Sequence, residues 1–173
     1  MKTLLLLRHA KSDWDAAYGA DHERPLNDRG ARSARIMGRL INAQGIAPQF
    51  AISSTAVRAR TTVELAAEAG NWDCPITLDA GLYESGLDGV LALAASAPDV
   101  ERLMLVGHQP TWSMLVHRLT GARADMKTAS VAAIELMLDG WSDLPETSGV
   151  LTALHHPRPY FGSEWDDVAG SAT

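Results

Sequence analysis

Short apolar runs of the kind that form buried strands recur along the chain, and segments with a helical period separate the earlier ones. The runs cover residues 3–7, 49–53, 76–78, 102–106, 131–138 and 150–154. Helical stripes follow Asn27 (Ile36, Met37, Leu40, Ile41) and Leu87 (Val90, Leu91, Ala94). This alternation predicts a three-layer α/β/α sandwich with a mainly parallel sheet. Residues 138–149 are expected to form a turn, so that the last two runs pair as an antiparallel hairpin at the sheet edge.

The first apolar run ends abruptly in two polar residues, because Arg8 and His9 directly follow four leucines. In open α/β sheets, ligands bind beyond the carboxyl ends of the strands. A guanidinium group suits phosphate oxygens, and a neutral imidazole offers a nucleophilic nitrogen near pH 7. The pair therefore suggests phosphoryl transfer through His9, although an isolated Arg-His pair is also consistent with a strand end that meets solvent.

A second apolar run, residues 102–106, ends in a similar way. Gly107 gives the backbone room to approach a ligand, and His108 follows it. Pro110 suits the first turn of a helix in which Trp112, Leu115, Val116 and Leu119 recur. We therefore expect His9 and His108 to face one pocket.

A third strand, residues 49–53, leads into a helix that carries positive charge near its start. Ser53, Ser54 and Thr55 are good capping residues, and a helix start favours anions. Arg58 lies in the expected first turn and is predicted to face the site. Arg60 is assigned to the solvated face of the helix.

Four segments in this order resemble the motifs of the histidine phosphatase superfamily and, within it, of the short SixA-like phosphohistidine phosphatases. They are Leu7-Arg8-His9, residues 54–62 with Ser54, Ala56, Arg58, Ala59 and Thr62, then Leu82-Tyr83-Glu84, and Val106-Gly107-His108 with Pro110. The resemblance extends from Lys2 to about Leu154. It implies the phosphoglycerate mutase-like form of the predicted fold, as a single domain over residues 1–173.

The resemblance also implies roles for individual residues. His9 would be the nucleophile that becomes phosphorylated, and Arg8, Arg58 and His108 would hold the phosphoryl oxygens. One departure concerns the residue after the nucleophile, where many members have glycine and this chain has Ala10.

Two further positions carry weaker assignments. Glu84 matches the position that many members use as proton donor, and the alternative for it is a surface carboxylate. Arg24 lies in a segment that SixA-like members share, and it is expected to touch the substrate.

The chemistry that this set implies needs no metal and no cofactor. Attack requires a neutral His9, whose pKa adjacent arginines lower, whereas His108 should be protonated in the substrate complex to donate to phosphate. The sequence contains no His-x-x-x-His motif, no Walker phosphate loop and no Gly-x-Gly-x-x-Gly motif, and Cys74 is the only cysteine. These features argue against metal and nucleotide-cofactor sites.

Composition agrees with an ordinary globular enzyme. The 173 residues are 46% hydrophobic and 21% charged, with a net charge of −6, which gives no electrostatic footprint for nucleic acid or acidic membranes. The apolar run before Arg8 is too short for a signal peptide or a membrane span, and a lone cysteine fits a reducing compartment, so a cytoplasmic location is expected. The tail, residues 157–173, shows no period; it is expected either to pack across the body or to stay loose, with a mobile end from Gly170.

We predict a phosphatase that forms a phosphohistidine on His9 and acts on phosphohistidine in a protein. The resemblance implies a phosphohistidine-containing phosphotransfer protein as the kind of partner. Two alternatives stay open: a phosphatase or mutase acting on a small phosphorylated metabolite, and a module that recognises phosphate without turnover. The short chain between Arg58 and Glu84 leaves little room for a substrate cap and favours the protein substrate.

Overall fold

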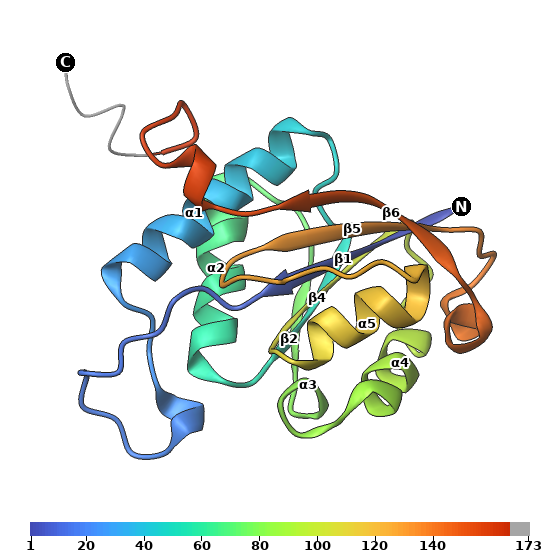
Figure 1. Cartoon of the computed structure of the whole chain (residues 1–173), viewed down its shortest axis with the longest axis horizontal. Coiled ribbons are helices and arrows are strands. Elements are labelled where there is room, and N and C mark those ends of the chain that lie inside the picture. Colours follow the sequence, from blue (N-terminus) through green and yellow to red (C-terminus); the bar gives the residue numbers. More distant parts are fainter. Residues whose placement is uncertain (167–173) are drawn as a thin grey trace.

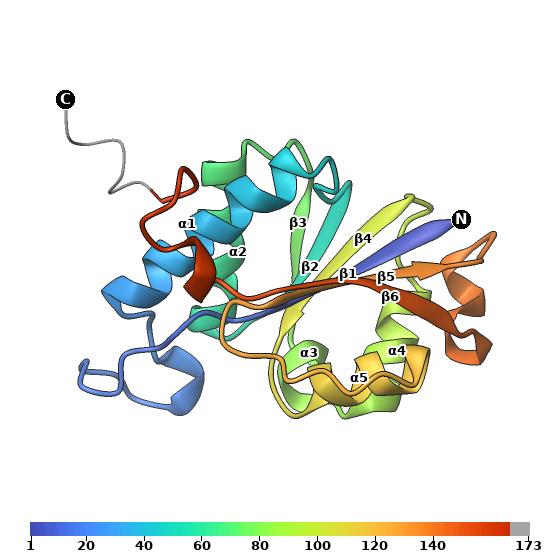
Figure 2. The same cartoon turned by 45° about the horizontal axis from the view of Figure 1, so that its top comes forward.

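A six-stranded sheet runs through the middle of the molecule, with helices on both faces (Figures 1 and 2). The computed structural model describes residues 1–166. The strands are β1 (Lys2–Arg8), β2 (Phe50–Ser54), β3 (Ile76–Asp79), β4 (Arg102–Gly107), β5 (Val131–Leu136) and β6 (Gly149–His155). Their order is β3-β2-β4-β1-β5-β6, in which the first four are parallel and β5 is antiparallel to both β1 and β6. The predicted hairpin at the sheet edge is therefore confirmed.

The helices form the two outer layers of the sandwich (Figure 2). One layer consists of α1 (Asp28–Ala43) and α2 (Val57–Gly70), and the other of α3 (Gly81–Glu84), α4 (Leu87–Ala95) and α5 (Thr111–Thr120). Three short 3-10 helices complete the description: η1 (Asp21–Glu23), η2 (Trp141–Glu146) and η3 (Arg158–Tyr160). The predicted three-layer α/β/α architecture is confirmed. None of the helices within residues 1–166 is long and apolar enough to cross a membrane.

The leucine run of β1 shows why this strand is central. Leu4 and Leu6 pack into the core on the side of α4 and α5, whereas Leu5 and Leu7 pack into the core on the side of α1 and α2. All four side chains are fully buried. A strand that is covered on both faces needs apolar residues at every position, which explains the continuous run.

The helices α1 and α2 are held close together by two glycines. A Cβ atom on Gly38 would collide with the carbonyl of Ala66, and one on Gly70 would collide with the carbonyl of Gly38. Trp72 closes the contact, since its indole N–H donates to the Gly38 carbonyl at 3.2 Å. This close packing fixes α2, whose first turn carries Arg58.

The structure adds detail where the sequence pattern was weak. The segment predicted as a plain turn contains η2, whose Trp141 and Leu144 are buried in the core. Pro110 lies at the N-cap of α5, after a cis peptide bond with Gln109, and not inside the helix.

The described part of the tail, residues 157–166, packs across the body. Its Tyr160, Phe161 and Trp165 lie against the core beside α1, and Asp166 is buried. The expected mobile end, residues 170–173, lies outside the described residues.

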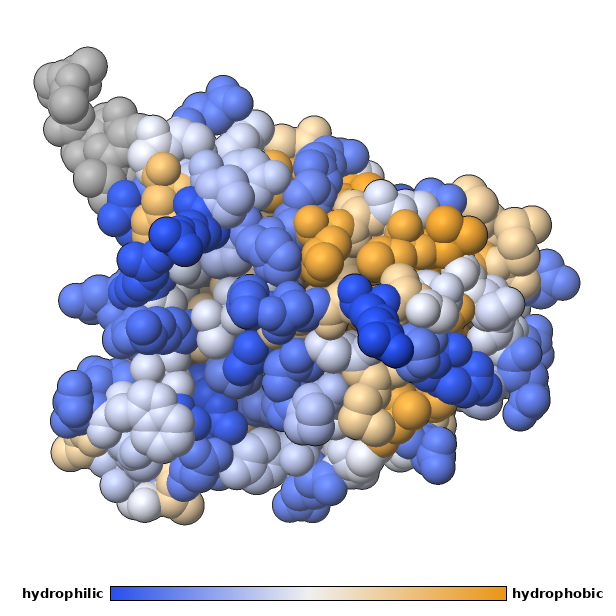
Figure 3. All heavy atoms as spheres, in the orientation of Figure 1, coloured by the Kyte–Doolittle hydropathy of each residue, from blue (hydrophilic) through white to orange (hydrophobic). Residues whose placement is uncertain are grey.

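The surface differs between the two sides of the molecule. Apolar side chains gather over the β6 edge, where Val150 is 64% exposed, whereas the side around α1 and the loop between β1 and α1 is mainly hydrophilic (Figure 3). That loop leads into the candidate site.

Candidate active site

The two histidines predicted to face one pocket lie side by side. Strands β1 and β4 are neighbours in register, with Arg8 opposite Gly107, and the backbone N–H of His9 donates to the Gly107 carbonyl at 3.0 Å. The chain therefore leaves both strands at the same edge of the sheet. The imidazole rings of His9 and His108 lie 5.1 Å apart, centroid to centroid.

Gly107 is needed for a different reason from the one expected. A Cβ atom at this position would overlap the indole ring of Trp112 in α5, and the indole N–H donates to the carbonyl of Leu7 at 3.1 Å. The close approach is therefore to a core side chain rather than to a ligand.

His9 is held in one orientation and one tautomer. Its Nδ1 lies 2.7 Å from the carbonyl oxygen of Ala10, which can only accept, so the proton is on Nδ1 and Nε2 keeps a lone pair. The pKa of His9 is lowered to about 4, mainly by burial and also by the charges of Arg58, Arg8 and Arg24, while the bond to the Ala10 carbonyl opposes the shift. His9 is thus a neutral potential nucleophile at pH 7.

The second histidine is also neutral when no substrate is bound. The pKa of His108 is lowered to about 3, mainly by burial and also by the charges of His9 and Arg58, while the charge of Asp21 opposes the shift. Its Nε2 lies 2.8 Å from the hydroxyl of Ser54. The protonated state expected for the substrate complex therefore depends on the negative charge that a phosphoryl group brings.

Two arginines flank the histidines with part of their donors unused. Arg8 donates from Nη1 to the Met126 carbonyl at 2.8 Å, and Arg58 donates from Nη1 to the Asp21 carbonyl at 2.8 Å. Within residues 1–166, the buried side-chain nitrogens that lack a hydrogen-bond partner are Arg8 Nε, Arg58 Nε and His108 Nδ1. Buried unpaired polar atoms are costly, and a site built to receive anionic oxygens explains why they gather here.

The central acidic residue of the site, Asp21, was not found by sequence reasoning. Its carboxylate accepts hydrogen bonds from Arg24 Nη2 at 2.9 Å, Arg58 Nη2 at 3.0 Å and the Tyr83 hydroxyl at 3.1 Å. Burial raises the pKa of Asp21, but the bond from Arg24 and the charge of Arg58 outweigh it and hold the pKa below its ordinary value. Asp21 therefore links the two arginines as a carboxylate. The spacing to Arg24 is the only signal in the sequence, since the contact with Arg58 spans 37 positions.

Arg24 is brought into the site as expected. It is only 6% exposed, its Nη1 donates to the Ser12 hydroxyl, and its guanidinium carbon lies 3.6 Å from the centre of the Trp14 ring. A cavity of about 340 Å³ opens here. Its lining residues are Arg8, His9, Lys11, Ser12, Trp14, Arg24 and Thr128.

Glu84 lies outside this cluster. It is an exposed residue at the end of α3, and its carboxylate forms no hydrogen bond or ion pair with any described residue. The neighbouring Tyr83 belongs to the cluster, because its ring centre lies 5.4 Å from that of His108 and 5.8 Å from the guanidinium carbon of Arg58. Sequence analysis included Tyr83 only as part of a motif.

The start of α2 differs from the expected capping pattern. The N-cap residue is Ala56, and Ser54 accepts a hydrogen bond from the Ala56 N–H at 3.2 Å while it also contacts His108. Thr55 pairs with His22 at 2.8 Å. The predicted capping residues are thus used to organise the site.

Arg60 and Thr62 follow Arg58 in α2 and lie on different faces of the helix, one exposed and one buried. Arg60 is exposed and donates to Glu64 at 2.8 Å, which confirms its place on the solvated face. Thr62 accepts from the Ala10 N–H at 2.9 Å and donates to the Arg58 carbonyl at 2.6 Å, so it ties the end of β1 to α2. The methyl group of Ala10 is fully buried in the core beside α1 and α2.

The remaining histidines at the end of β6 have protein partners. His155 Nδ1 lies 3.2 Å from the Tyr160 hydroxyl, and His156 Nδ1 lies 2.6 Å from the Ser130 hydroxyl. In residues 1–166, no three His, Cys, Asp or Glu side chains are gathered as a metal site.

Comparisons with known sequences identify the family. The model of the histidine phosphatase superfamily (branch 1) matches residues 4–89. An uncharacterized chloroplastic protein of Arabidopsis thaliana is 30% identical over 158 residues, which are 86% of this chain and 72% of that protein. An uncharacterized protein of Mycobacterium tuberculosis is 32% identical over 164 residues, 88% of this chain and 100% of that protein. A 2,3-bisphosphoglycerate-dependent phosphoglycerate mutase of Sphingopyxis alaskensis is 33% identical over 96 residues, 54% of this chain and 42% of the mutase.

Solved structures agree with this assignment. Two proteins to which the name phosphohistidine phosphatase SixA has been provisionally given superpose with a TM-score of 0.77 each. The one from Nakamurella multipartitia is 28% identical, with 90% of this chain and 96% of that chain covered. The one from Agrobacterium tumefaciens is 27% identical, with 90% and 98% covered. On these grounds, the chain belongs to branch 1 of the histidine phosphatase superfamily and is SixA-like within it.

Proposed function

We propose that this protein is a metal-independent phosphatase that works through a phosphohistidine on His9 and removes phosphate from phosphohistidine in a protein. The observation that carries the proposal is the state of His9. Its Nδ1 is committed to the Ala10 carbonyl, its pKa is lowered to about 4, and it lies beside three buried nitrogens without partners. A neutral nucleophile next to unused phosphate donors is what phosphoryl transfer requires.

The reaction has two steps. In the first, the Nε2 lone pair of His9 attacks phosphorus, the bond to the leaving nitrogen or oxygen breaks, and the leaving group takes a proton. In the second, water attacks phosphorus, the bond to Nε2 breaks, and inorganic phosphate leaves with His9 restored. Arg8, Arg58 and His108 stabilise the charge on the transferring oxygens in both steps.

Proton delivery and substrate contact are assigned to two further residues. Glu84 donates the proton to the leaving group, and its exposed position at the end of α3 allows it to meet a substrate that approaches from solvent. Arg24 contacts the substrate, since it lines the catalytic cavity beside His9.

Two observations support a protein substrate. The chain between Arg58 and Glu84 forms only the rest of α2, β3 and α3, so it adds no separate cap over the site. Two solved structures that each cover 90% of this chain have been provisionally named phosphohistidine phosphatase SixA. A phosphohistidine side chain on a phosphotransfer protein fits an uncovered cavity of about 340 Å³.

A small phosphorylated metabolite is the second candidate, because phosphoglycerate mutases match about half of this chain. A substrate panel decides between the two. The purified protein is incubated with a phosphohistidine-containing phosphotransfer protein, a phosphoserine peptide and sugar phosphates, and kcat/KM is measured for each. The proposal requires the highest kcat/KM on phosphohistidine. A higher value on a sugar phosphate would favour the metabolite, and binding without release of phosphate would indicate a recognition module.

A further inference from the structure

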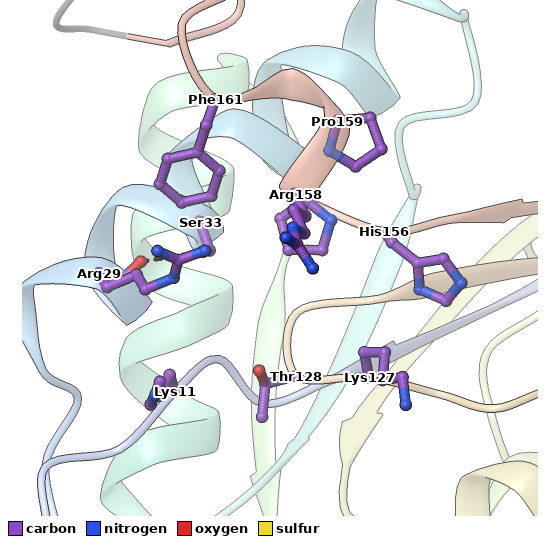
Figure 4. Close-up of a pocket in the computed structure, with 10 residues that line it drawn as sticks. Lys11, Arg29, Ser33, Lys127, Thr128, His156, Arg158, Pro159 and Phe161 are labelled. Carbon is purple, nitrogen blue, oxygen red and sulfur yellow. Dashed lines mark hydrogen bonds between the residues drawn. The ribbon is translucent and has the colours of Figure 1, made fainter.

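The structure contains a second cavity, with a volume of about 390 Å³, whose lining side chains are drawn in Figure 4. Lys11 and Thr128 line both cavities, so the two share a wall. The remaining walls of the second cavity come from the start of α1, the loop before β5, and the segment that follows β6 and includes η3. Cavities of this size are typical of small-molecule sites.

All the charged residues that line this second cavity are basic. Lys11, Arg29, Lys127 and Arg158 line it together with His156, and none of the lining residues is acidic. Lys127 pairs with Asp125, whereas Lys11, Arg29 and Arg158 form no ion pair with any residue that the structure describes. Three cations that have no ion-pair partner and line one cavity attract an anion.

The rest of the lining is apolar and is held in place. Pro157, Pro159 and Phe161 supply this surface. The guanidinium carbons of Arg29 and Arg32 lie 4.8 and 4.7 Å from the centre of the Phe161 ring. Arg32 in turn donates to the buried Asp166 at 2.7 Å, which fixes the segment after β6 against α1.

The arrangement of these side chains shows where a ligand would sit. Figure 4 shows Arg158 projecting from η3 into the space between Arg29 and His156, with Lys11 and Thr128 on the opposite side. The cations thus surround the cavity from several elements. A guanidinium group offers paired donors that match a phosphate or carboxylate group.

We propose that this second cavity binds a small organic anion, in which one phosphate or carboxylate group meets Lys11, Arg29 and Arg158 and an apolar body lies against Pro159 and Phe161. The site is separate from the residues that perform phosphoryl transfer. Because the two cavities share the wall formed by Lys11 and Thr128, the bound anion lies directly beside a phosphoryl group held at His9.

The test uses phenylphosphonate, an organic anion with an apolar ring and a P–C bond that the catalytic site cannot hydrolyse. The full chain is titrated by ¹H–¹⁵N NMR with the catalytic cavity saturated by vanadate. We expect phenylphosphonate to shift the amide signals of Ser33, Thr128 and Phe161. Arg158→Ala should weaken its binding about tenfold, as expected for the loss of one charge-assisted hydrogen bond. Benzyl alcohol, which has the ring without the charge, should not bind.

Two controls separate this site from the catalytic one. Arg60→Ala removes an exposed arginine that pairs with Glu64 and should leave the binding unchanged. Arg158→Ala should hydrolyse p-nitrophenyl phosphate at the rate of the unaltered protein, since Arg158 is no part of the catalytic cavity. If the protein neither binds vanadate nor turns over phosphate esters, the proposed function fails, and the same titration without vanadate still tests the second cavity.

Three results would overturn the inference. The first is that phenylphosphonate shifts only signals at the catalytic cavity, such as those of His9 and Ser12. The second is an unchanged affinity in Arg158→Ala. The third is binding of an acidic peptide at Ser33 and Phe161 in the absence of any binding of phenylphosphonate, which would assign this surface to a protein partner.

Discussion

Replacing Asp21 by alanine tests whether this carboxylate organises the arginines of the active site. It accepts bonds from Arg24 at 3.2 and 2.9 Å, from Arg58 at 3.0 Å and from Tyr83 at 3.1 Å. The side chains of both arginines are only 7% exposed, so the substitution leaves two buried cations without their carboxylate partner.

The expected loss of stability follows from these contacts. Each hydrogen bond to a charged group contributes about 1.5–3 kcal/mol when it is buried. The Asp21 side chain is 49% exposed, and solvent screening reduces each contribution. We therefore expect the free energy of unfolding, measured in urea, to fall by about 2 kcal/mol in total.

The kinetic effect should be smaller than that of losing an arginine. Arg58 keeps its bond to the Asp21 backbone carbonyl, which alanine retains. Removal of a preorganised donor typically lowers kcat by about 10²–10³-fold, so a loosened Arg58 should lower kcat on a phosphate ester by about tenfold. Asp21→Asn keeps one acceptor oxygen and loses the charge. Its kcat should therefore lie between that of the unaltered protein and that of Asp21→Ala.

Glu64→Ala is the matched control. The Arg60–Glu64 pair has a similar length, 2.8 Å, but its side chains are 56% and 50% exposed. Because this pair is exposed and screened by solvent, its loss should barely change the free energy of unfolding and should leave kcat unchanged. If Asp21→Ala matched Glu64→Ala in both stability and kcat, the carboxylate would have no organising role and the reasoning would be refuted.

Four further outcomes are expected. His9→Ala should abolish turnover without unfolding the protein, and labelled substrate should mark His9 in the unaltered chain; substantial activity in a folded His9→Ala protein would exclude the covalent mechanism. EDTA should leave the rate nearly unchanged while vanadate inhibits, and a loss in EDTA that Mg²⁺ restores would contradict the charge stabilisation assigned to the arginines. Glu84→Gln should slow cleavage of an alkyl phosphate by about 10²-fold and barely affect an activated aryl phosphate, because a poor leaving group depends most on a proton donor; equal, small effects would make Glu84 a surface carboxylate. Since the pKa of His9 is about 4 and that of His108 about 3, the unfolded chain binds more protons between pH 3 and 6.5, so urea unfolding should show stability falling as the pH drops through this window. His108→Gln should flatten this dependence, and an unchanged slope would show that burial of the imidazole is not its cause.

Residues close together in sequence determined much of this protein. The leucines of β1 required a strand buried on both faces, and the abrupt change to Arg8 and His9 located its end at the functional edge. Strand direction is set by connections through helices, so the meeting of His9 and His108 followed from the alternation of elements alone. The solvated position of Arg60 also followed from local helical geometry.

The tertiary structure alone decided which side chains complete the site. The bond between Asp21 and Arg58 depends on the path of the loop between β1 and α1, and no periodicity predicts where an irregular loop places a carboxylate. Only the packing of the short helix α3 places Tyr83 beside His108 and leaves Glu84 exposed.

No pattern in the sequence predicted the second cavity. Lys11, Arg29, Lys127 and Arg158 come from four separate elements, and in the sequence each is an ordinary surface charge. The segment after β6 showed no helical or strand period because Phe161 and Asp166 are held by Arg29 and Arg32 rather than by regular backbone pairing. The periodicity of apolar residues along the sequence predicts which face each helix or strand buries. Contacts between polar side chains that are distant in the sequence form only when the layers pack together.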